Sequence, residues 1–333
     1  MNLFVSINGI DVSGFVIGQL LGNESNSNLI DISVTDEAGS KSDKVELTLV
    51  RDGNIPPPPK GAEILVMLPN AQGMLMPVGT FYSDAPTTRG NKKDGHQMRI
   101  SGTSANMGGS LKEKRTQSYS NTTVKKVVEI IAGRHSLEPV VGDSLASIAV
   151  LHKDQTNVSD MHFLTEWAKD LGAIFKPTQR KLLFVEKGTT KSATGIPLPA
   201  VMPLATQIID YEWEGSQRDE YKMIKAAYHD QDGATRLYEV AGEGEPSYTL
   251  SKSYPGKDEA KRAADAALKE GVAGAEKAKI TIIGDASALA EGAITLPPLQ
   301  PELAGSWSIR KVVHNVRKAV GYTSKLDLER VRS

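Results

Sequence analysis

The chain has 333 residues, of which 39% are hydrophobic and 24% are charged. This composition is typical of a soluble globular protein with about two or three domains. Its formal net charge of −1 excludes a polyelectrolyte binder, and the absence of cysteine excludes disulfides, thiolate catalysis and cysteine-ligated zinc.

The N-terminus has no basic segment followed by a long apolar one, as a signal peptide would, and no apolar run approaches the roughly 20 residues that span a bilayer. We therefore expect synthesis in a cytoplasm and no stable membrane insertion.

Residues 1–104 are predicted to form β-structure. Apolar and polar residues alternate at 3–7, 30–35 and 45–50, which is typical of strands with one buried face, and Asn8-Gly9 predicts a tight turn after the first. Further strands are predicted at 63–68, 77–83 and 97–102, and the prolines at 56–59 predict a stiff surface connection. About six or seven short strands at this spacing favour a small barrel or sandwich.

Residues 105–187 are predicted to form a small α/β domain that begins with a helix. Apolar side chains at 124, 127, 128 and 131 recur at helical spacing and would form one buried face. Thr122 or Asn121 can cap the start of this helix, and Gly133 can end it.

A second helix is predicted over residues 160–171, where Phe, Leu, Trp and Ala form an apolar stripe. Ser159 or Asp160 can cap it and Gly172 can end it. A strand at 181–186 completes this domain, in which we interpret the aromatic residues as core.

Residues 188–206 are rich in glycine, proline and threonine and predict a linker, after which 207–333 are predicted to be a second β-domain with a helix at 258–270. Its predicted strands are 208–214, 221–229, 235–240, 279–283, 293–296, 306–313 and 322–329. The expected fold class is α+β, mainly β, with two β-domains flanking a small α/β domain.

The sequence contains no phosphate-binding loop and no hydrolase elbow, and Gly108-Gly109 lacks the strand–loop–helix context of a phosphate cradle. The densest set of possible metal ligands is His152, Asp154, Asp160 and His162. Their spacing matches no metal motif, and Asp160 is better explained as a helix cap, so we expect neither a metal nor a cofactor. His135 and His314 have ordinary interpretations, at a helix C-terminus and at a strand end respectively.

Two carboxylate pairs, Glu212 with Glu214 and Asp230 with Asp232, share a strand face at i, i+2. Glycosidases need two carboxylates a few ångströms apart, but these usually come from separate elements. Because Trp213 separates the first pair, we predict a solvated outer face with Trp213 turned inward, and we expect no catalytic residue.

Charge is segregated along the chain. Residues 207–247 hold ten acidic and four basic side chains. In contrast, residues 306–333 hold two acidic and seven basic side chains, and residues 105–135 hold two acidic and six basic side chains. The basic residues at 105–135 include Lys112, Lys114, Arg115, Lys125 and Lys126. We interpret them as a solvated surface rather than a nucleic-acid site, because few aromatic residues accompany them. The segregation also suits electrostatic complementarity between subunits or partner proteins.

Three segments together resemble the late control protein D family, which supplies the tail hub of contractile phages: SVTDEAGSKSDKVELTLVRDGN at 33–54, SGTSANMGGSLKEKRTQSYSNTTVKKVVEIIAGRHSLEP at 101–139 and QTNVSDMHFLTEWAKDLGAIFK at 155–176. The last segment is also similar to the hub-like part of type VI secretion spike proteins. Those often carry glutamate where this chain has Val158, which predicts the loss of one polar contact.

The resemblance implies two similar β-barrel domains per subunit and a homotrimer, hence a pseudo-sixfold ring that adapts a tail tube to a central spike. The implied partners are the spike, the tail tube or tube-initiator protein, and the baseplate wedge and tape-measure proteins, with no sequence-specific nucleic acid. The implied location is the baseplate of a virion tail or bacteriocin particle. Two alternatives stay open: a baseplate-associated cell-wall hydrolase and a DNA-binding late regulator.

Overall fold

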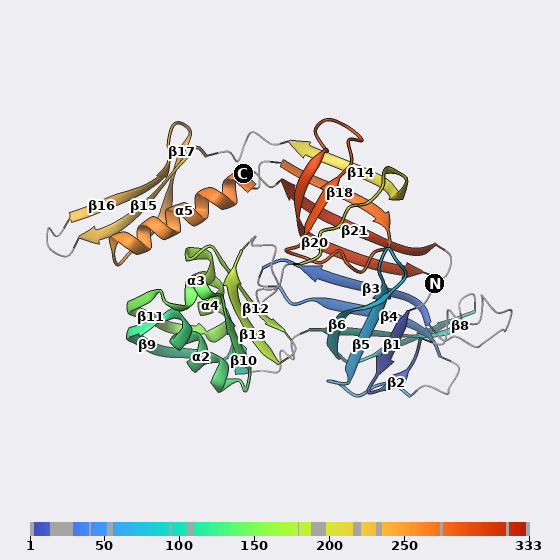
Figure 1. The fold of residues 1–333 in the computed structure, drawn as a ribbon. Coiled ribbons are helices and arrows are strands. Elements are labelled where there is room, and N and C mark those ends of the chain that lie inside the picture. Colours follow the sequence, from blue (N-terminus) through green and yellow to red (C-terminus); the bar gives the residue numbers. More distant parts are fainter. Residues whose placement is uncertain are drawn as a thin grey trace.

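The structure is a computed structural model that describes residues 3–13, 29–39, 41–51, 56–92, 95–104, 110–178, 180–187, 198–215, 221–230, 235–273, 276–317 and 320–330, with the backbone alone for Asp230, Val272 and Ala273. Strands dominate and helices are few, which confirms the predicted α+β, mainly β class (Figure 1). Gly108-Gly109 and residues 188–197 of the predicted linker lie outside the described residues.

The two predicted β regions lie in one large sheet. The first region contributes β1 Phe4–Ile7, β2 Ile10–Asp11, β3 Leu29–Glu37, β4 Lys44–Val50, β5 Glu63–Pro69, β6 Leu75–Ser83, β7 Thr87–Asn91 and β8 Gly95–Thr103. The second contributes β14 Ile208–Gly215, β18 Glu276–Ile283, β19 Ala293–Leu296, β20 Gly305–Arg317 and β21 Gly321–Arg330. The main path runs β14-β18-β21-β20-β3-β4-β8-β6-β5-β1-β2, with β19 paired to β20 and β7 to β8. Because this path is open at both ends, the structure does not confirm that either region closes into a barrel.

Each β region has its own buried core. In the first, the alternation of β4 places Val45, Leu47 and Leu49 in the interior, and the predicted turn is confirmed because Asn8 and Gly9 both adopt positive φ between β1 and β2. In the second, Trp307 is fully buried, donates from its indole nitrogen to the Leu303 carbonyl at 2.8 Å and lies beneath the Arg330 guanidinium.

Strand β20 joins the two regions. It pairs with β21 along its length. Its N-terminal part also pairs with β19, and its C-terminal half also pairs antiparallel with β3, so that Val316 lies beside Ile32. A second tie runs along the segment before β19, where the Ala290 N–H donates to the Asp36 carboxylate at 2.9 Å. The two regions therefore share backbone pairing rather than only a surface contact.

A compact α/β module lies beside this sheet (Figure 1). It comprises β9 Lys114–Thr123, α2 Val124–Arg134, β10 Glu138–Val141, α3 Asp143–Ala146, β11 Ala149–Ser159, α4 Asp160–Asp170, β12 Ala173–Thr178 and β13 Lys181–Glu186, with η1 Ser110–Lys112 before it. Strand β9 pairs with β11, and β10, β13 and β12 form a second small sheet. The apolar faces of α2 and α4 pack into one core, which confirms both predicted stripes.

The predicted caps of these helices are partly confirmed. Helix α4 is capped by Ser159, whose Oγ accepts from the His162 N–H at 3.2 Å, and Gly172 follows it with φ +61°. Helix α2 is capped by Thr123, one residue after the predicted Thr122, and runs through Gly133 to Arg134.

The helix predicted at 258–270 is present as α5 Lys257–Ala273, and it belongs to a separate layer. It packs on a three-stranded sheet of β15 Met223–Asp230, β16 Thr235–Gly242 and β17 Ser247–Tyr254, with β15 in the centre. This layer contacts the α/β module at Asp170, which accepts from Tyr254 Oη at 3.3 Å and pairs with Lys252 of β17. The second β region thus carries an inserted β–β–β–α layer.

Candidate assembly surfaces and buried polar clusters

A hollow of about 520 Å³ opens between the β5–β6 turn and the end of β18. Its wall includes Pro69, Met202, Ile283 and Tyr322, and Asp285 is the one carboxylate among the described residues that line it. Asp285 already accepts from the N–H groups of Ala71 and Ser287. Tyr322 is the other titratable side chain of the wall, and its hydroxyl lies 2.9 Å from Nδ1 of the buried His314. We therefore interpret Asp285 and Tyr322 as structural rather than as a catalytic pair.

The four candidate metal ligands do not converge. His152 and Asp154 contact each other at 3.1 Å on the exposed face of β11, whereas His162 is exposed at the start of α4 and Asp160 is buried. Within the described ranges, no group of three or more histidines and carboxylates could hold a metal ion.

Asp160 is instead the centre of a buried polar cluster. Its carboxylate accepts from Arg134 Nη1 at 3.2 Å and from Gln155 Nε2 at 2.8 Å, and it lies 2.8 Å from His135 Nε2. Arg115 adds a second guanidinium, with Nε 3.7 Å from the carboxylate. Asp160 is fully buried, so these contacts replace the water that a charged carboxylate requires. The prediction of Asp160 as a possible cap was wrong, since Ser159 is the cap and Asp160 ties β9, α2 and β11 together.

One side of this cluster resembles a hydrolase relay. Ser110 Oγ lies 2.8 Å from His135 Nδ1, and His135 Nε2 lies 2.8 Å from Asp160. A hydroxyl, an imidazole and a carboxylate in series can activate a nucleophile. Here, however, His135 is only 2% exposed and the carboxylate is bound by Arg134, so we interpret the series as structural.

At Val158, where the loss of one polar contact was predicted, the main chain makes a polar contact of its own. The Val158 carbonyl accepts from Gln155 Nε2 at 3.0 Å, and the same amide nitrogen donates to Asp160.

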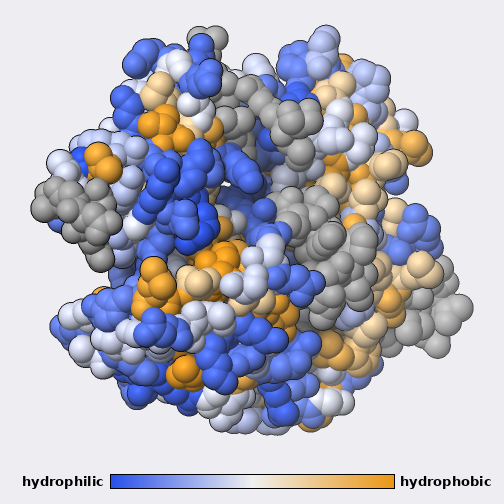
Figure 2. Space-filling view, turned by 60° about the vertical axis from the view of Figure 1, so that its left-hand side comes forward, coloured by the Kyte–Doolittle hydropathy of each residue, from blue (hydrophilic) through white to orange (hydrophobic). Residues whose placement is uncertain are grey.

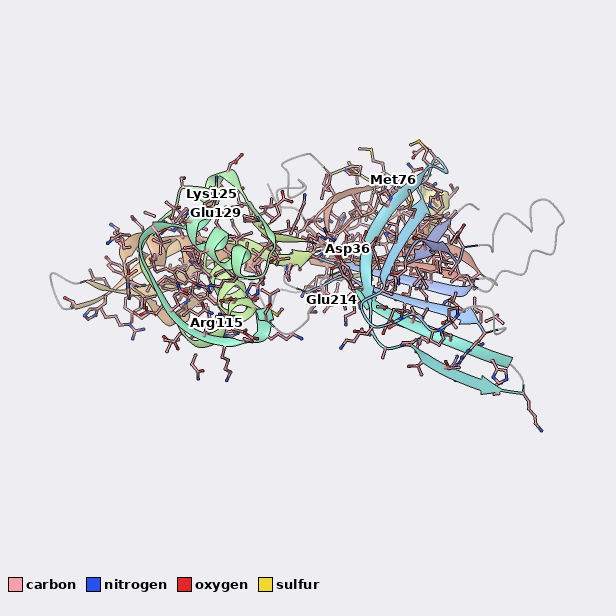
Figure 3. The ribbon with its side chains drawn as sticks, turned by 90° about the horizontal axis from the view of Figure 1, so that it is seen from below. Asp36, Met76, Arg115, Lys125, Glu129 and Glu214 are labelled. Carbon is pink, nitrogen blue, oxygen red and sulfur yellow. The ribbon has the colours of Figure 1, made fainter. Side chains whose placement is uncertain are left out.

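A second buried cluster fastens the α/β module to the large sheet. Lys176 of β12 lies 3.1 Å from Asp36 and 2.6 Å from Asp43, and donates to the Glu37 carbonyl at 3.0 Å. Asp36 lies where the module meets the sheet (Figure 3). Burial and the neighbouring Asp36 raise the pKa of Asp43 to about 7. Burial also acts to raise the pKa of Asp36, but Lys176 and hydrogen bonds from Asp43 and the Ala290 N–H hold it below its usual value.

His314 forms a third cluster, although a strand-end position was predicted. It lies within β20 and is buried: Nε2 faces the Ala288 carbonyl at 3.1 Å, and Nδ1 lies 2.9 Å from Ser324 Oγ and 2.9 Å from Tyr322 Oη. Since a carbonyl only accepts, Nε2 carries the proton and Nδ1 accepts. Burial lowers the pKa of His314 to about 4, so the imidazole is neutral at physiological pH.

Because His314 is buried in its neutral form, we expect the folded protein to lose stability in acid. A group whose pKa falls from 6.5 unfolded to about 4 folded stabilises the fold fully above pH 6.5, and that contribution is lost as the pH falls toward 4. Between pH 7 and 4, His314→Gln should lose about 3 kcal/mol less stability than the parent, as measured by urea unfolding. His96→Gln, at an exposed position, is the control. An equal acid-induced loss in the parent and His314→Gln would contradict the assignment.

The Glu212 and Glu214 pair lies on the exposed outer face of β14, and Glu212 pairs with Lys279 at 3.3 Å. Trp213 shares the opposite, core-side face with buried Ala278, but it is 40% exposed because β14 is the outermost strand. The solvated face is confirmed and the inward burial of Trp213 is not. The side chains of Asp230 and Asp232 lie outside the described residues.

The basic residues near the first helix do not all lie on one side of the module. Lys125 is exposed on α2, and Lys126 pairs with Glu129 at 3.5 Å. Arg115 lies on the opposite side of the module from Lys125 and Glu129 in Figure 3. Arg115 is already engaged within the module, because its guanidinium is directed at Asp160.

On the face of the molecule seen in Figure 2, apolar patches lie among hydrophilic residues. No helix in the described part of the chain is long and apolar enough to cross a membrane.

No protein-family model matches the chain. Among curated proteins, it is 27% identical to the probable baseplate hub protein of Escherichia phage 186, over 90% of this chain and 88% of the relative. It is also 27% identical to the probable baseplate hub protein of Escherichia phage P2, over 93% and 90%. The resemblance to phage tail hubs predicted from the sequence is thereby confirmed.

Solved structures agree at the level of the fold. The tail protein of Neisseria meningitidis MC58 covers 99% of this chain and 97% of its own with a TM-score of 0.70 at 11% identity, and the 43 kDa tail protein of prophage MuSo2 from Shewanella oneidensis covers 99% and 98% with a TM-score of 0.67 at 12% identity. The E. coli protein c3393, a component of the type VI secretion system, covers 99% of this chain and 77% of its own with a TM-score of 0.61 at 12% identity. This chain is thus a homologue of phage baseplate hub proteins, with a fold shared by phage tail proteins and a type VI secretion component.

Proposed function

We propose that this protein is the structural hub of a contractile phage tail or phage-derived particle and lies in its baseplate. The observation that carries the proposal is the similarity to two baseplate hub proteins over nine-tenths of the chain or more. The described residues support a mechanical role, since their buried charges tie elements of the fold together.

The finer proposal is a homotrimeric ring. We propose that residues 1–104 and 207–333 act as two tube-like domains flanking the small α/β domain at 105–187, so that three subunits present six similar units. Such a ring can match a sixfold tail tube on one side and a threefold spike on the other. The pairing of β20 with β3 supports it, because it holds the two β regions as a rigid pair. The spike and the tube or tube-initiator protein would be its direct partners, with wedge and tape-measure proteins further out.

The test is to express the chain with its neighbouring tail genes, purify the particles and image them by cryo-electron microscopy. We expect three copies around the axis, between tube and spike, so that this chain contributes a mass near three times 35.8 kDa in solution or in the presence of the spike. Particles that assemble fully without the chain would contradict the proposal. So would a lytic band in a peptidoglycan zymogram that disappears in Glu212→Gln, which would support the hydrolase alternative.

A further inference from the structure

The layer formed by β15, β16, β17 and α5 is one continuous insertion with a core of its own. The chain enters it after β14 and leaves it before β18, and Gly215 of β14 and Glu276 of β18 are direct cross-strand partners. Both ends of the insertion therefore meet the large sheet at the same place. A unit attached at a single place can change its orientation without breaking the strand pairing of the sheet that carries it.

Helix α5 lies between the three-stranded sheet of the layer and the α/β module (Figure 1). Among the described residues, the buried core of the layer and the buried core of the module are separate clusters. Small residues meet at one point of the contact, where a β-carbon added at Gly172 would lie 3.3 Å from Cβ of Ala266. Within the described part of the chain, no continuous apolar core joins the layer to the module.

Charged side chains cross the contact. Asp170 at the end of α4 pairs with Lys252 of β17, accepts from Tyr254 Oη at 3.3 Å and lies 3.5 Å from Lys153 of its own module. Asp170 and Lys153 are mostly buried, so solvent screens their charges only in part. Asp170 therefore holds the layer to the module by charge-assisted hydrogen bonds.

The packing around this aspartate is incomplete. A cavity of about 20 Å³ is lined by Val150 and Trp167 of the module and by Tyr254 and Arg262 of the layer. Arg262 Nε is buried and has no hydrogen-bond partner among the residues that the structure describes. Permanent interiors rarely leave such groups unpaired, whereas polar interfaces between units of one chain usually permit relative motion.

We infer that the layer is a movable arm that undocks from the α/β module as a folded unit, and that Asp170 is the latch that holds it in the docked position. On undocking, Asp170 would lose Lys252 and Tyr254 but keep Lys153, which belongs to its own module. Val150 would then become accessible, because it lines the cavity between the two units. The inference concerns the chain alone and does not rest on the proposed hub function.

Thiol labelling of the full chain tests the undocking. Because the chain has no cysteine, a single introduced thiol reports on one site. Val150→Cys places a thiol at the contact with the layer, where Val150 is 4% exposed, and Val128→Cys places one in the module core, where Val128 is fully buried. The probe is an aromatic disulfide reagent that reacts with accessible thiols and releases a coloured thiolate.

We expect Val150→Cys to react faster than Val128→Cys, because undocking uncovers the first site and only unfolding of the module uncovers the second. Equal labelling rates would show that Val150 is reached only when the module itself unfolds. The layer would then not move as a separate unit, and the inference would be overturned.

Two variants test the latch. Asp170→Asn keeps the shape of the side chain and removes its charge, and it should raise the labelling rate of Val150→Cys at least about tenfold, as expected when one partner of a largely buried charged pair is lost. The rate of Val128→Cys should rise much less. Lys252→Met removes the partner from the layer side and should act in the same direction, and it leaves α4 intact if Asp170→Asn disturbs that helix.

Glu166→Gln is the matched control. Glu166 lies on the same helix as Asp170 and pairs on the surface with Lys169 at 2.6 Å, so its replacement should leave the labelling of Val150→Cys unchanged. An equal rise in Glu166→Gln and Asp170→Asn would show a general effect of charge and overturn the latch. An unchanged rate in Lys252→Met would overturn it as well, because the ion pair would then not hold the two units together.

Discussion

Asp160→Ala is expected to lower the free energy of unfolding by about 3–5 kcal/mol, because removing one partner of a buried ion pair leaves the others without compensation. Arg134 would lose a carboxylate at 3.2 Å, His135 one at 2.8 Å and Gln155 an acceptor at 2.8 Å. Since these residues come from α2 and β11, their loss should loosen the whole α/β module. Chemical unfolding followed by circular dichroism measures the change.

A neighbouring aspartate provides the matched control. Asp154 lies on β11 and is exposed, where it contacts Ser118 and His152. Asp154→Ala should lower the free energy of unfolding far less than Asp160→Ala does, because exposed polar pairs contribute little to stability. Similar losses in Asp154→Ala and Asp160→Ala would contradict the role given to the buried cluster.

The buried contacts of Asp160 could not be predicted from the sequence. The helix it begins was predicted from an apolar stripe and a Ser-Asp cap signal, both of which are local. The partners of Asp160 include Arg134, 26 residues before it, and Arg115, 45 residues before it, on elements that the apolar stripe says nothing about. Polar residues that meet only after packing leave no periodic signal, so the cluster could not be found before the structure.

The same limit explains the strands that were missed. Strand β4 was predicted because its apolar residues alternate with polar ones, whereas β9 (KRTQSYSNTT) buries only Tyr119 and lacks that alternation. Strand β11 is similarly polar, and the two strands stabilise each other mainly by pairing. Cross-strand pairing between such segments depends on their partner, not on their own pattern.

The pairing of strands that are far apart in the chain could not be predicted from the sequence either. Each strand of the β20–β3 pair was predicted, but their contact joins segments roughly 280 residues apart, and alternation indicates a face rather than a neighbour. For the same reason, the face of Trp213 was predicted correctly and its exposure was not. A residue on the core side of an edge strand stays partly open until another strand covers it.

The second large loss of stability is expected when Lys176 is replaced. Lys176→Met would leave Asp36 and Asp43 buried side by side without their cation, which lies 3.1 and 2.6 Å from them. The free energy of unfolding should fall by about 3–5 kcal/mol at pH 8. Lys181→Met on the adjacent strand is the control, because Lys181 is half-exposed and its pair with Glu138 is 3.9 Å long.

The pH dependence of Lys176→Met identifies the cause. Without the lysine, the folded pKa values of both carboxyls should rise above their unfolded value of about 4. Such groups stabilise the fold fully below the unfolded pKa, and the contribution is lost as pH rises through the folded pKa. The variant should therefore lose least stability near pH 4, and Asp43→Asn should restore part of its stability at pH 8, since one buried charge is removed. A loss that is independent of pH and unaffected by Asp43→Asn would indicate lost packing of the lysine stem instead. That result would leave the attachment of the module to the large sheet dependent on apolar contact rather than on this ion cluster.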